Sequence, residues 1–496
     1  MENRYYHSTR GSGKLSPKEA VLRGIADDGG LYVWDGLEDV RLDLDALLKL
    51  DYPAMAKRLF AEVLWDYSEE ELARCVDLAY TGKFDSEQIT PLVMAGDLPV
   101  LELFHGPTSA FKDVALCMLP QLMSTALNGR KEKVMIVTAT SGDTGKAALS
   151  GFQDAENIGI TVFYPYGKVS DIQRLQMVCQ QGENVRVCAI RGNFDDAQSG
   201  VKRLFHSAQA KAALDEDHIV LSSANSINIG RLVPQIVYYF AAYRQLLEAG
   251  AVQMGEEVNF CVPTGNFGNV LAGYYAKLMG LPVHRLIVAA NENNVLEDFL
   301  NTGVYDRNRP FHQTISPSMD ILISSNLERM LYYLSGKDSA KVAGWMKDLA
   351  EQGRYEVDAQ TKEKIASLFL SASCDNAQTS AQIRSVYARC GYVMDPHTAV
   401  GAHVLEQLKD RLDGKVTVLL STASPYKFTR DVLKALGEAQ EGLDDFACMG
   451  KLEQLSKQKI PAGLYALKDM PERFADVISC EEMEEYVIAG AREILK

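Results

Sequence analysis

One lysine of this chain, Lys112, stands in an apolar setting that could make its amine reactive. The segment 104–115 reads FHGPTSAFKDVA, and Lys112 falls where a helix-like run begins. Burial and the positive end of a helix both lower the pKa of an amine, which raises the fraction that is neutral. Neutral amine is the form that condenses with an aldehyde to give a Schiff base. Most lysines are solvated surface groups, so the segment alone leaves that alternative open.

Two glycine-containing loops follow strand-like runs and could bind anions. The first, ATSGDTGK at 139–146, follows KVMIVT, and the second, PTGNFGN at 263–269, follows EVNFCV. Small hydroxyl residues and glycines that open a helix present backbone N–H groups and the positive helix end, which suit a carboxylate or a phosphate. The same residues also make ordinary helix caps and tight turns. Each loop is therefore either an anion site or a turn that only packs.

Two more loops combine hydroxyl or amide side chains with a basic residue. The loop SANSINIGR at 223–231 leads into a long helix-like run, and its Arg231 could hold a second anionic group through charge-assisted hydrogen bonds. The loop STASPYKF at 421–428 follows VTVLL, and its hydroxyls could hold a heteroatom of a ligand. The alternatives are a capped helix with a solvated arginine and a strand end that is simply closed.

These loops need a scaffold, and the pattern of the chain predicts a parallel sheet wrapped by helices. Short β-branched runs alternate with glycine-containing turns and helical periods, and the runs are KVMIVTA, GITVFYP, NVRVCAI, HIVLSS, EVNFCVP, HRLIVAA and, at 415–421, KVTVLLS. Parallel strands require crossover connections, and ligands bind such sheets beyond the carboxyl ends of the strands. The candidate loops lie at those ends.

The chain divides into three predicted parts. Residues 1–95 contain amphipathic helix-like segments at 42–50, 53–63 and 68–78 with few strand signals, so they are expected to form a separate, mostly helical unit. Residues 96–440 hold the strands and form the core, in which the strand pattern stops between about 293 and 385 and an insertion is expected. Residues 441–496 form a C-terminal segment.

The charge balance and the cysteines exclude several classes of partner. With 51 basic against 66 acidic residues the net charge is −15, so nucleic acid and anionic membranes are not expected partners, and an anionic substrate needs a local set of donors. The nine cysteines are scattered without metal-ligand spacing, which predicts reduced, buried thiols and no metal site. No segment is apolar enough for a signal peptide or a membrane span, so we expect a cytoplasmic protein.

Five segments resemble, in order and approximate spacing, those of the threonine synthase family, whose members are fold-type II enzymes that use pyridoxal 5′-phosphate (PLP): HGPTSAFKDVA, TATSGDTGKAA, SANSINIGR, PTGNFGNVLAG and STASPYKF. The opening stretches YHSTRG at 6–11 and AVLRGIADDGGL at 20–31 resemble the N-terminal domain of that family. The resemblance covers most of the chain. It implies an α/β fold of the tryptophan synthase β type, with two largely parallel sheets wrapped by helices and a mostly helical N-terminal domain.

The resemblance also implies roles for particular residues. Lys112 would be the catalytic lysine that carries the cofactor, and the hydroxyl of Thr422 would meet the pyridine nitrogen. A neutral hydroxyl there would leave that nitrogen largely unprotonated and temper the cofactor as an electron sink. The cofactor phosphate would be bound by Gly265, Asn266, Phe267, Gly268 and Asn269. The substrate would be held at its carboxylate by Ser141, Gly142, Asp143, Thr144 and Gly145, and at its phosphate by Asn225, Ser226, Asn228 and Arg231.

Two positions depart from the pattern of the family. Many relatives have a histidine where this chain has Ser424, and the wider fold often has an asparagine where Asp143 stands. The first departure puts in doubt an imidazole beside the pyridine ring. The second leaves the partner of the cofactor's O3′ unassigned.

The resemblance implies the conversion of O-phospho-L-homoserine and water to L-threonine and phosphate, by a monomer or a homodimer, with Lys112 as general base at Cα. The nearest alternative is a related PLP lyase, such as a serine or threonine dehydratase or a phospho-lyase that releases 2-oxobutyrate. A non-catalytic nucleotide-binding protein on a doubly wound sheet is a further alternative, but no strand in the sequence is followed by G-x-G-x-x-G.

Overall fold

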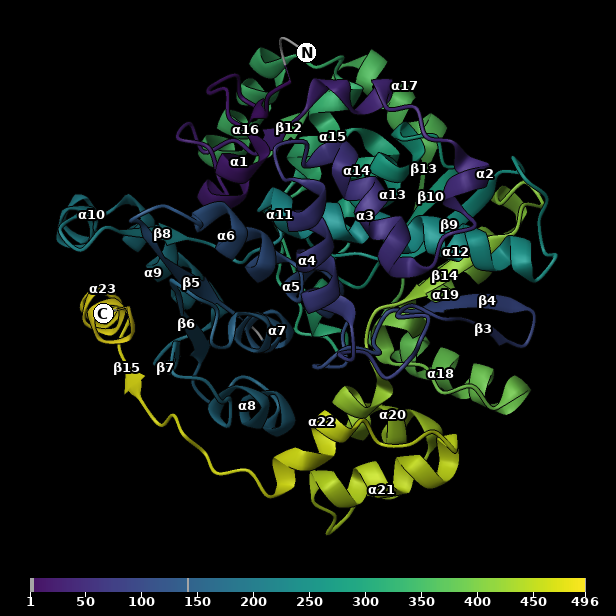
Figure 1. The fold of residues 1–496 in the computed structure, drawn as a ribbon. Coiled ribbons are helices and arrows are strands. Elements are labelled where there is room, and N and C mark those ends of the chain that lie inside the picture. The colour runs from purple at the N-terminus through teal and green to yellow at the C-terminus, as the bar shows by residue number, and fades with distance from the viewer. Residues whose placement is uncertain (1–3, 141, 496) are drawn as a thin grey trace.

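Two sheets form the centre of the protein in the computed structural model, which describes residues 4–140 and 142–495, with Phe194 and Asp195 described by their backbone only (Figure 1). The larger sheet has six strands in the order β13-β10-β9-β14-β4-β3, and the smaller has five in the order β15-β7-β6-β5-β8. Every neighbouring pair is parallel except β3 and β4. The expected fold of two largely parallel sheets is confirmed.

The strands of the larger sheet are β3 (Leu92–Ala95), β4 (Leu98–Glu102), β9 (Val258–Pro263), β10 (Val283–Ala290), β13 (Phe369–Ser373) and β14 (Thr417–Ser421). Those of the smaller sheet are β5 (Lys133–Ala139), β6 (Ile158–Pro165), β7 (Val185–Ile190), β8 (Ile219–Ser222) and β15 (Val477–Ile478). All seven strand-like runs of the sequence are strands. Apart from β8, they are almost wholly buried, as expected for parallel strands that are covered by helices on both faces.

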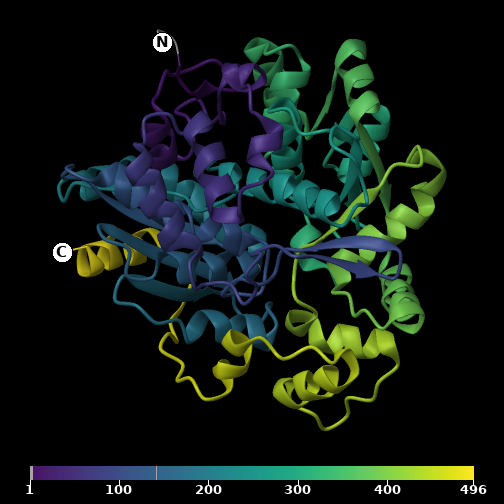
Figure 2. The ribbon, with the colours of Figure 1, turned by 45° about the vertical axis from the view of Figure 1, so that its right-hand side comes forward.

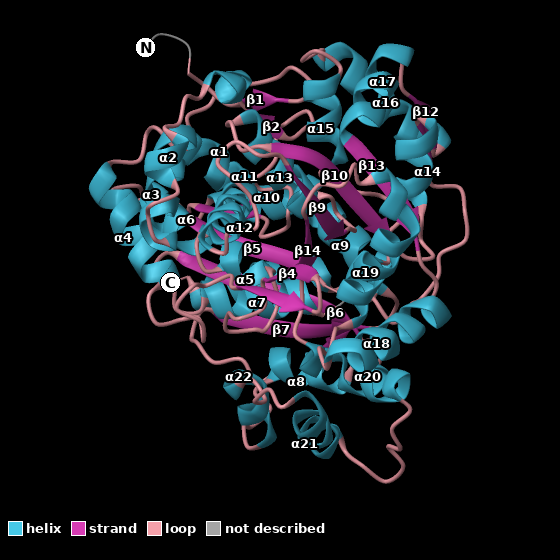
Figure 3. Cartoon of the chain, turned by 90° about the vertical axis from the view of Figure 1, so that its right-hand side faces the viewer, coloured by secondary structure: helices cyan, strands magenta, loops and turns pink. Residues whose placement is uncertain are grey.

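The helices that wrap the sheets are α5 (Lys112–Leu116), α6 (Leu119–Leu127), α7 (Asp143–Phe152), α8 (Asp171–Val178), α9 (Phe194–His206), α10 (Ala208–Asp215), α11 (Ile229–Leu232), α12 (Ile236–Glu248), α13 (Gly268–Leu278), α18 (Asn376–Cys390), α19 (Pro396–Leu408) and α20 (Thr429–Leu436). Figure 3 shows these helices on both sides of the magenta strands. Helices and strands alternate along the chain, as the sequence pattern predicted.

The N-terminal part is mostly helical and lies beside both sheets at the top of Figure 1. It contains β1 (His7–Ser8), α1 (Pro17–Arg23), β2 (Tyr32–Val33), α2 (Leu44–Leu47), α3 (Tyr52–Val63) and α4 (Glu69–Tyr80). The side chains of Ser16, Asp51 and Ser68 cap the starts of α1, α3 and α4, which explains why these helices begin where they do. The three helix-like segments expected there are confirmed.

The region between 293 and 385 contains α14 (Val295–Thr302), β11 (Val304–Asp306), α15 (Leu327–Leu334), α16 (Ser339–Gln352), β12 (Arg354–Glu356), α17 (Ala359–Leu368), β13 and most of α18. The expectation that strands stop here was wrong, because β11 and β12 form a small antiparallel pair and β13 forms the edge of the larger sheet beside β10. The run FLSAS is short and half polar, so it carries little strand signal. Tertiary packing against its parallel neighbour makes it a strand.

The C-terminal segment returns to the smaller sheet. After α21 (Asp445–Ser456) and α22 (Ala462–Tyr465), the chain crosses below the molecule to β15 and α23 (Met483–Ile494), as Figures 1 and 2 show in yellow. Met483, Val487 and Ala491 of α23 pack with Met135 and Val137 of β5 in one buried cluster. No helix of the described residues is long and apolar enough to cross a membrane. All cysteines are free, and all but Cys390 and Cys480 are buried.

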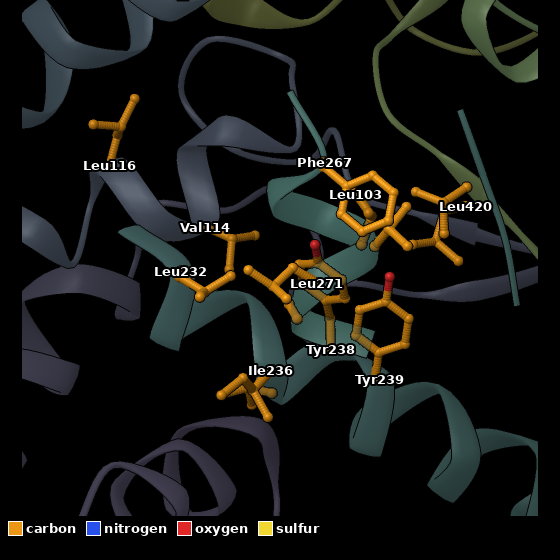
Figure 4. Close-up of a cluster of buried hydrophobic side chains, with 14 of the residues drawn as sticks. Leu103, Val114, Leu116, Leu232, Ile236, Tyr238, Tyr239, Phe267, Leu271 and Leu420 are labelled. Carbon is orange, nitrogen blue, oxygen red and sulfur yellow. The ribbon is translucent and has the colours of Figure 1, made fainter. Parts of the chain in front are cut away.

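Apolar packing supports the elements that carry the candidate site. Figure 4 shows Val114 of α5 beside Leu232 of α11, with Leu271 of α13 and the rings of Tyr238 and Tyr239 nearby. All five side chains are fully buried. Burial of a large apolar side chain contributes about 1.5–3 kcal/mol, so this cluster fixes the four helices α5, α11, α12 and α13 relative to one another.

Candidate active site

The segment before α5 is tied to the end of β14, and this places Lys112 beside the loop STASPYKF. The backbone N–H of Phe111 donates to the carbonyl of Thr422 at 2.8 Å, and that of Ser424 donates to the carbonyl of Ser109 at 3.0 Å. Thr422 is 6% exposed. Two segments that are more than 300 residues apart in the sequence thus form one wall of a candidate site.

Lys112 lies in that wall with its amine largely buried. Its side chain is 11% exposed, and Nζ lies 3.4 Å from Oγ of Ser318 and 3.8 Å from Oδ2 of Asp143. Burial lowers the pKa of Lys112 to about 8, although the Asp143 carboxylate acts in the opposite direction. A pKa of about 8 in place of 10.5 raises the fraction of neutral amine near neutral pH. The lowered pKa expected from the apolar segment is therefore present.

The loop between β9 and α13 has the donors that a phosphate requires. Among the described residues, no acceptor is bonded to the backbone N–H groups from Gly265 to Asn269. Phe267 has a left-handed backbone, with φ of 63°, which turns the chain into α13. Oδ1 of Asn269 accepts from the hydroxyls of Tyr238 at 2.7 Å and Tyr239 at 2.9 Å. Its Nδ2 is buried without a partner in the described chain, so the tyrosines orient a free donor.

Gly265 has no room for a side chain. A Cβ atom at this position would lie 2.6 Å from the carbonyl oxygen of Ser318, which is part of the backbone and cannot rotate away. The second glycine of the loop, Gly268, has room for a side chain, since a Cβ there would meet its nearest atoms, in Asn326 and Ser226, at 3.5 Å. The loop thus packs against the segment 317–319 at Gly265 and lies beside the loop 223–231 at Gly268.

The resemblance implies that this loop holds the phosphate of PLP. We therefore expect Gly265→Ala to weaken PLP binding roughly tenfold to hundredfold, because forcing a methyl group into a packed site costs about 1–3 kcal/mol. Titration of the apo-protein with PLP, followed by absorbance, measures the dissociation constant. Gly344→Ala is the matched control, since a Cβ at Gly344 would meet nothing within 4 Å. Equal affinity in both variants would show that the loop does not bear on cofactor binding.

Arg231 is a buried cation without an ion-pair partner among the described residues. It is 2% exposed, its Nη1 donates to the carbonyl of Ala224 at 2.8 Å, and its Nε has no partner in the described chain. Burial lowers its pKa to about 10, and its charge also lowers the pKa of Lys112. A buried guanidinium with an unused donor is costly unless an anion completes it. Such a setting is typical of an anion site, and the charge of Arg231 acts on Lys112.

The other members of the 223–231 loop are placed differently. Ser226 lies beside the loop 265–269, and its Oγ accepts from Nδ2 of Asn326 at 3.0 Å. Oδ1 of Asn225 accepts from Oγ1 of Thr138 at 2.9 Å. The side-chain oxygen and nitrogen of Asn228 both form hydrogen bonds with other residues of the chain. Oδ1 accepts from the N–H of Gly230 at 2.8 Å, and Nδ2 donates to the carbonyl of Val21 at 2.9 Å. Asn228 thus starts α11 and anchors it to α1.

The loop after β5 opens α7 with a buried carboxylate. Asp143 is 4% exposed, and Gly142 before it has φ of 141°, a conformation that favours glycine. A Cβ at Gly142 would lie 2.5 Å from the side chain of Gln173, whose Nε2 donates to Oδ1 of Asp143 at 3.2 Å. Thr144 and Gly145 follow in the first turn of α7. Ser141 lies outside the described residues.

Sequence reasoning missed Ser318 and His397. Ser318 lies in the turn 317–319, and its Oγ is 3.3 Å from Oδ2 of Asp143 as well as 3.4 Å from Lys112. His397, at the start of α19, is 2% exposed; its Nδ1 bonds Oδ1 of Asp395 at 2.7 Å and its Nε2 accepts from the N–H of Ser318 at 3.1 Å. In the sequence, the helix start Asp395-Pro396-His397 could have drawn attention to His397. His397 brings an imidazole near the site although position 424 is a serine.

Arg329, in α15, was also missed and is fully buried. It donates to the carbonyl of Tyr32 at 2.9 Å, to Oδ1 of Asn326 at 2.6 Å and to the carbonyl of Ile227 at 2.5 Å. Asn326 in turn donates to the carbonyl of Asn266 at 3.2 Å. One side chain therefore connects the N-terminal part, the 223–231 loop and the loop after β9.

Removing this connection with Arg329→Met is expected to lower the free energy of unfolding by about 3 kcal/mol, because two buried acceptors and one partly buried acceptor lose their donor. Urea denaturation measures the loss. Arg389→Met is the control, since Arg389 is half exposed and its pair with Glu406 spans 3.8 Å; a change within about 0.5 kcal/mol is expected there. Similar small losses in both variants would contradict the assigned role of Arg329.

Comparisons with known proteins agree with this geometry. A family model described as "Pyridoxal-phosphate dependent enzyme" matches residues 85–374, which is more than half of the chain. The fold and the residues around Lys112 thus define a pyridoxal-phosphate-dependent enzyme. Models described as "Threonine synthase N terminus" and "Threonine synthase, C-terminal" match residues 5–80 and 398–487. The chain belongs to the threonine synthase family.

Relatives and solved structures lead to the same family. The chain is 40% identical over 439 residues to "Threonine synthase" of Pseudomonas aeruginosa, with 88% of this chain and 91% of the relative covered. It resembles the crystal structure of PLP-bound threonine synthase from Brucella melitensis with a TM-score of 0.87, at 38% identity, covering 99% of this chain and 100% of the other. It is also 38% identical over 439 residues to "Threonine synthase-like 1" of Homo sapiens. That match covers 85% of this chain and only 58% of the human protein.

Proposed function

We propose that the protein converts O-phospho-L-homoserine and water to L-threonine and phosphate, with PLP carried on Lys112. One observation supports this most directly: two separate sets of unpaired anion-binding donors lie in one site with a lysine of lowered pKa. The loop 265–269 would hold the phosphate of the cofactor, and Arg231 with Asn225 and Ser226 would hold the phosphate of the substrate. A substrate that carries its own phosphate needs both.

The described residues suit PLP. The free Nδ2 of Asn269 and the unbonded N–H groups of its loop offer donors to a phosphate, and Thr422 adjoins Phe111, the neighbour of Lys112. When bound, PLP supplies an electron sink that acidifies the carbon next to the substrate's amino group. The resemblance assigns Thr422 to the pyridine nitrogen and the segment 141–145 to the substrate carboxylate.

In the proposed reaction the residues of this chain bind, orient and move protons. Lys112, once free of the cofactor, is the best-placed base for the proton at Cα of the substrate and could then serve Cβ and Cγ. Arg231 would hold the phosphate that leaves from Cγ, and its positive charge would stabilise the departing anion. The acidic protein, with a net charge of −15, needs such a local cation to attract an anionic substrate.

The test is to incubate the PLP-loaded protein with O-phospho-L-homoserine and to identify the products. Threonine and phosphate in equal amounts would support the proposal. Release of a 2-oxo acid in place of threonine would show the related lyase instead, and a colourless protein without turnover would contradict both. We further propose that the protein works in the cytoplasm. We also propose that it is a monomer or a homodimer, and sedimentation analysis of the purified protein would measure its oligomeric state.

A further inference from the structure

A second lysine, Lys427, is buried close to Lys112. It lies in the turn Pro425–Phe428 after β14, its side chain has no exposed surface, and its Nζ is 2.7 Å from Oδ1 of Asp143. The same Nζ donates to the carbonyl of Thr108 at 3.0 Å. A fully buried ammonium is costly unless it is paired, so its position depends on Asp143.

Asp143 lies between the two lysines. Oδ1 receives Lys427 and Oδ2 is 3.8 Å from Nζ of Lys112. Gln173 and Ser318 donate to the two oxygens, at 3.2 and 3.3 Å. The charge of Lys427, which is in contact with it, and the charge of Lys112 hold the pKa of this carboxyl far below its ordinary value in spite of burial. Asp143 is therefore a fixed negative charge, unlike the neutral asparagine that the wider fold often has there.

Charged groups face Lys112 from several elements. Burial lowers the pKa of Lys112 most; among the charges, Asp143 of α7 and Asp113 of α5 raise it, whereas Lys427 of the turn after β14 and Arg231 of α11 lower it. His397 of α19 lies near this group and accepts from the N–H of Ser318. Lys427 and Asp143 are in direct contact and have opposite effects on the same amine.

We propose that Lys427 is a positioning residue that, through its ion pair with Asp143, sets the protonation state of the Lys112 amine. Asp143 alone would hold Lys112 as an ammonium ion, which cannot attack an aldehyde or take a proton. Lys427 offsets that charge and orients the carboxylate, so that the amine keeps a useful neutral fraction. The inference rests on the proposed function only in taking Lys112 as the lysine that carries PLP.

The pKa of Lys112 in the apo-protein tests this directly. Competitive labelling with trace acetic anhydride across a pH series, with peptide mapping, reports the neutral fraction of this one amine. We expect Lys427→Met to raise the pKa by about 1 and Asp143→Asn to lower it by about 1, since charges a few ångströms away shift a pKa by such amounts. Shifts of the Lys112 pKa in opposite directions would support the proposal, because a general loss of structure would shift this pKa in the same direction in both variants.

Two further variants keep the test decisive. Lys427→Met leaves a buried carboxylate without its main partner and could unfold the site, so the double variant Asp143→Asn/Lys427→Met, which removes both charges, is measured as well. Its pKa should fall between those of the single variants, and a value outside that interval contradicts the proposal. Lys146→Met is the matched control: Lys146 is a largely buried lysine of α7 that donates to Gln180 at 2.7 Å, and it is absent from the charges that act on Lys112.

Two kinds of failure are distinguishable. If Lys427→Met and Asp143→Asn leave the pKa of Lys112 as Lys146→Met does, while borohydride still fixes PLP on Lys112 of the native holoenzyme, only the present inference is overturned. If borohydride fixes PLP on another residue, the proposed function fails as well, and the labelling result stands by itself as a property of the amine.

Discussion

Replacing Lys112 by alanine is expected to abolish the visible absorbance of the purified protein and to lower turnover of O-phospho-L-homoserine by about 10⁴-fold or more, because it removes both the attachment point of the cofactor and the proposed base. The amine is buried, has a lowered pKa and lies among the donors of the site. Absorbance spectra of the protein dialysed against PLP, together with an assay for released phosphate, measure both effects.

The control for this variant is Lys146→Ala, which removes another lysine of lowered pKa. Its holoenzyme should keep the visible absorbance. An alanine at position 112 with native absorbance and native turnover would remove Lys112 from the proposed chemistry.

Replacing Arg231 by alanine should raise the KM for the phosphorylated substrate and lower kcat/KM roughly 100-fold to 1000-fold, since loss of a buried charge-assisted contact costs about 2–5 kcal/mol. PLP content should stay near that of the native protein, because the cofactor phosphate is assigned to the loop 265–269. Steady-state kinetics and the PLP released by alkali give the two quantities.

The conservative variant Arg231→Lys separates charge from geometry. It keeps a cation at the site but loses the planar donor set, so it should recover part of the loss in kcat/KM. If KM is unchanged in Arg231→Ala, or if the main effect is a loss of PLP, the residue does not hold the substrate phosphate.

The sequence predicted the parts of the fold whose local pattern agrees with their environment. Strands such as β5 and β9 are buried on both faces and therefore read as continuous apolar runs. The helices α3 and α4 begin at capping residues that the sequence shows. Strand β13 was missed because the run FLSAS has no such pattern, and only pairing with β10 makes it a strand. Similarly, β15 has two residues and depends on β7.

The candidate site could be predicted only where its residues lie in recognisable loops. Lys112, Arg231 and the loop 265–269 lie within the segments that carry the family resemblance. Ser318 and His397 come from segments that are far from those loops in sequence, and spacing cannot show that they meet at Asp143 and Lys112.

Residue type alone also could not separate binding from packing. Asn228 was expected at the substrate phosphate, yet its side chain bonds Gly230 and Val21 within the chain. Lys427 was part of a quoted segment but had no assigned role, since a lysine in a polar turn is ordinarily solvated. Its contact with Asp143 appears only when β5 and β14 are placed in space.

Borohydride reduction of the PLP-loaded protein, followed by proteolysis and mass spectrometry, tests the attachment of the cofactor most directly. The reduced pyridoxyl group should be found on the peptide that contains Lys112, in about one copy per chain. A label on Lys427, Lys146 or any other lysine, or no label at all, would contradict the central claim.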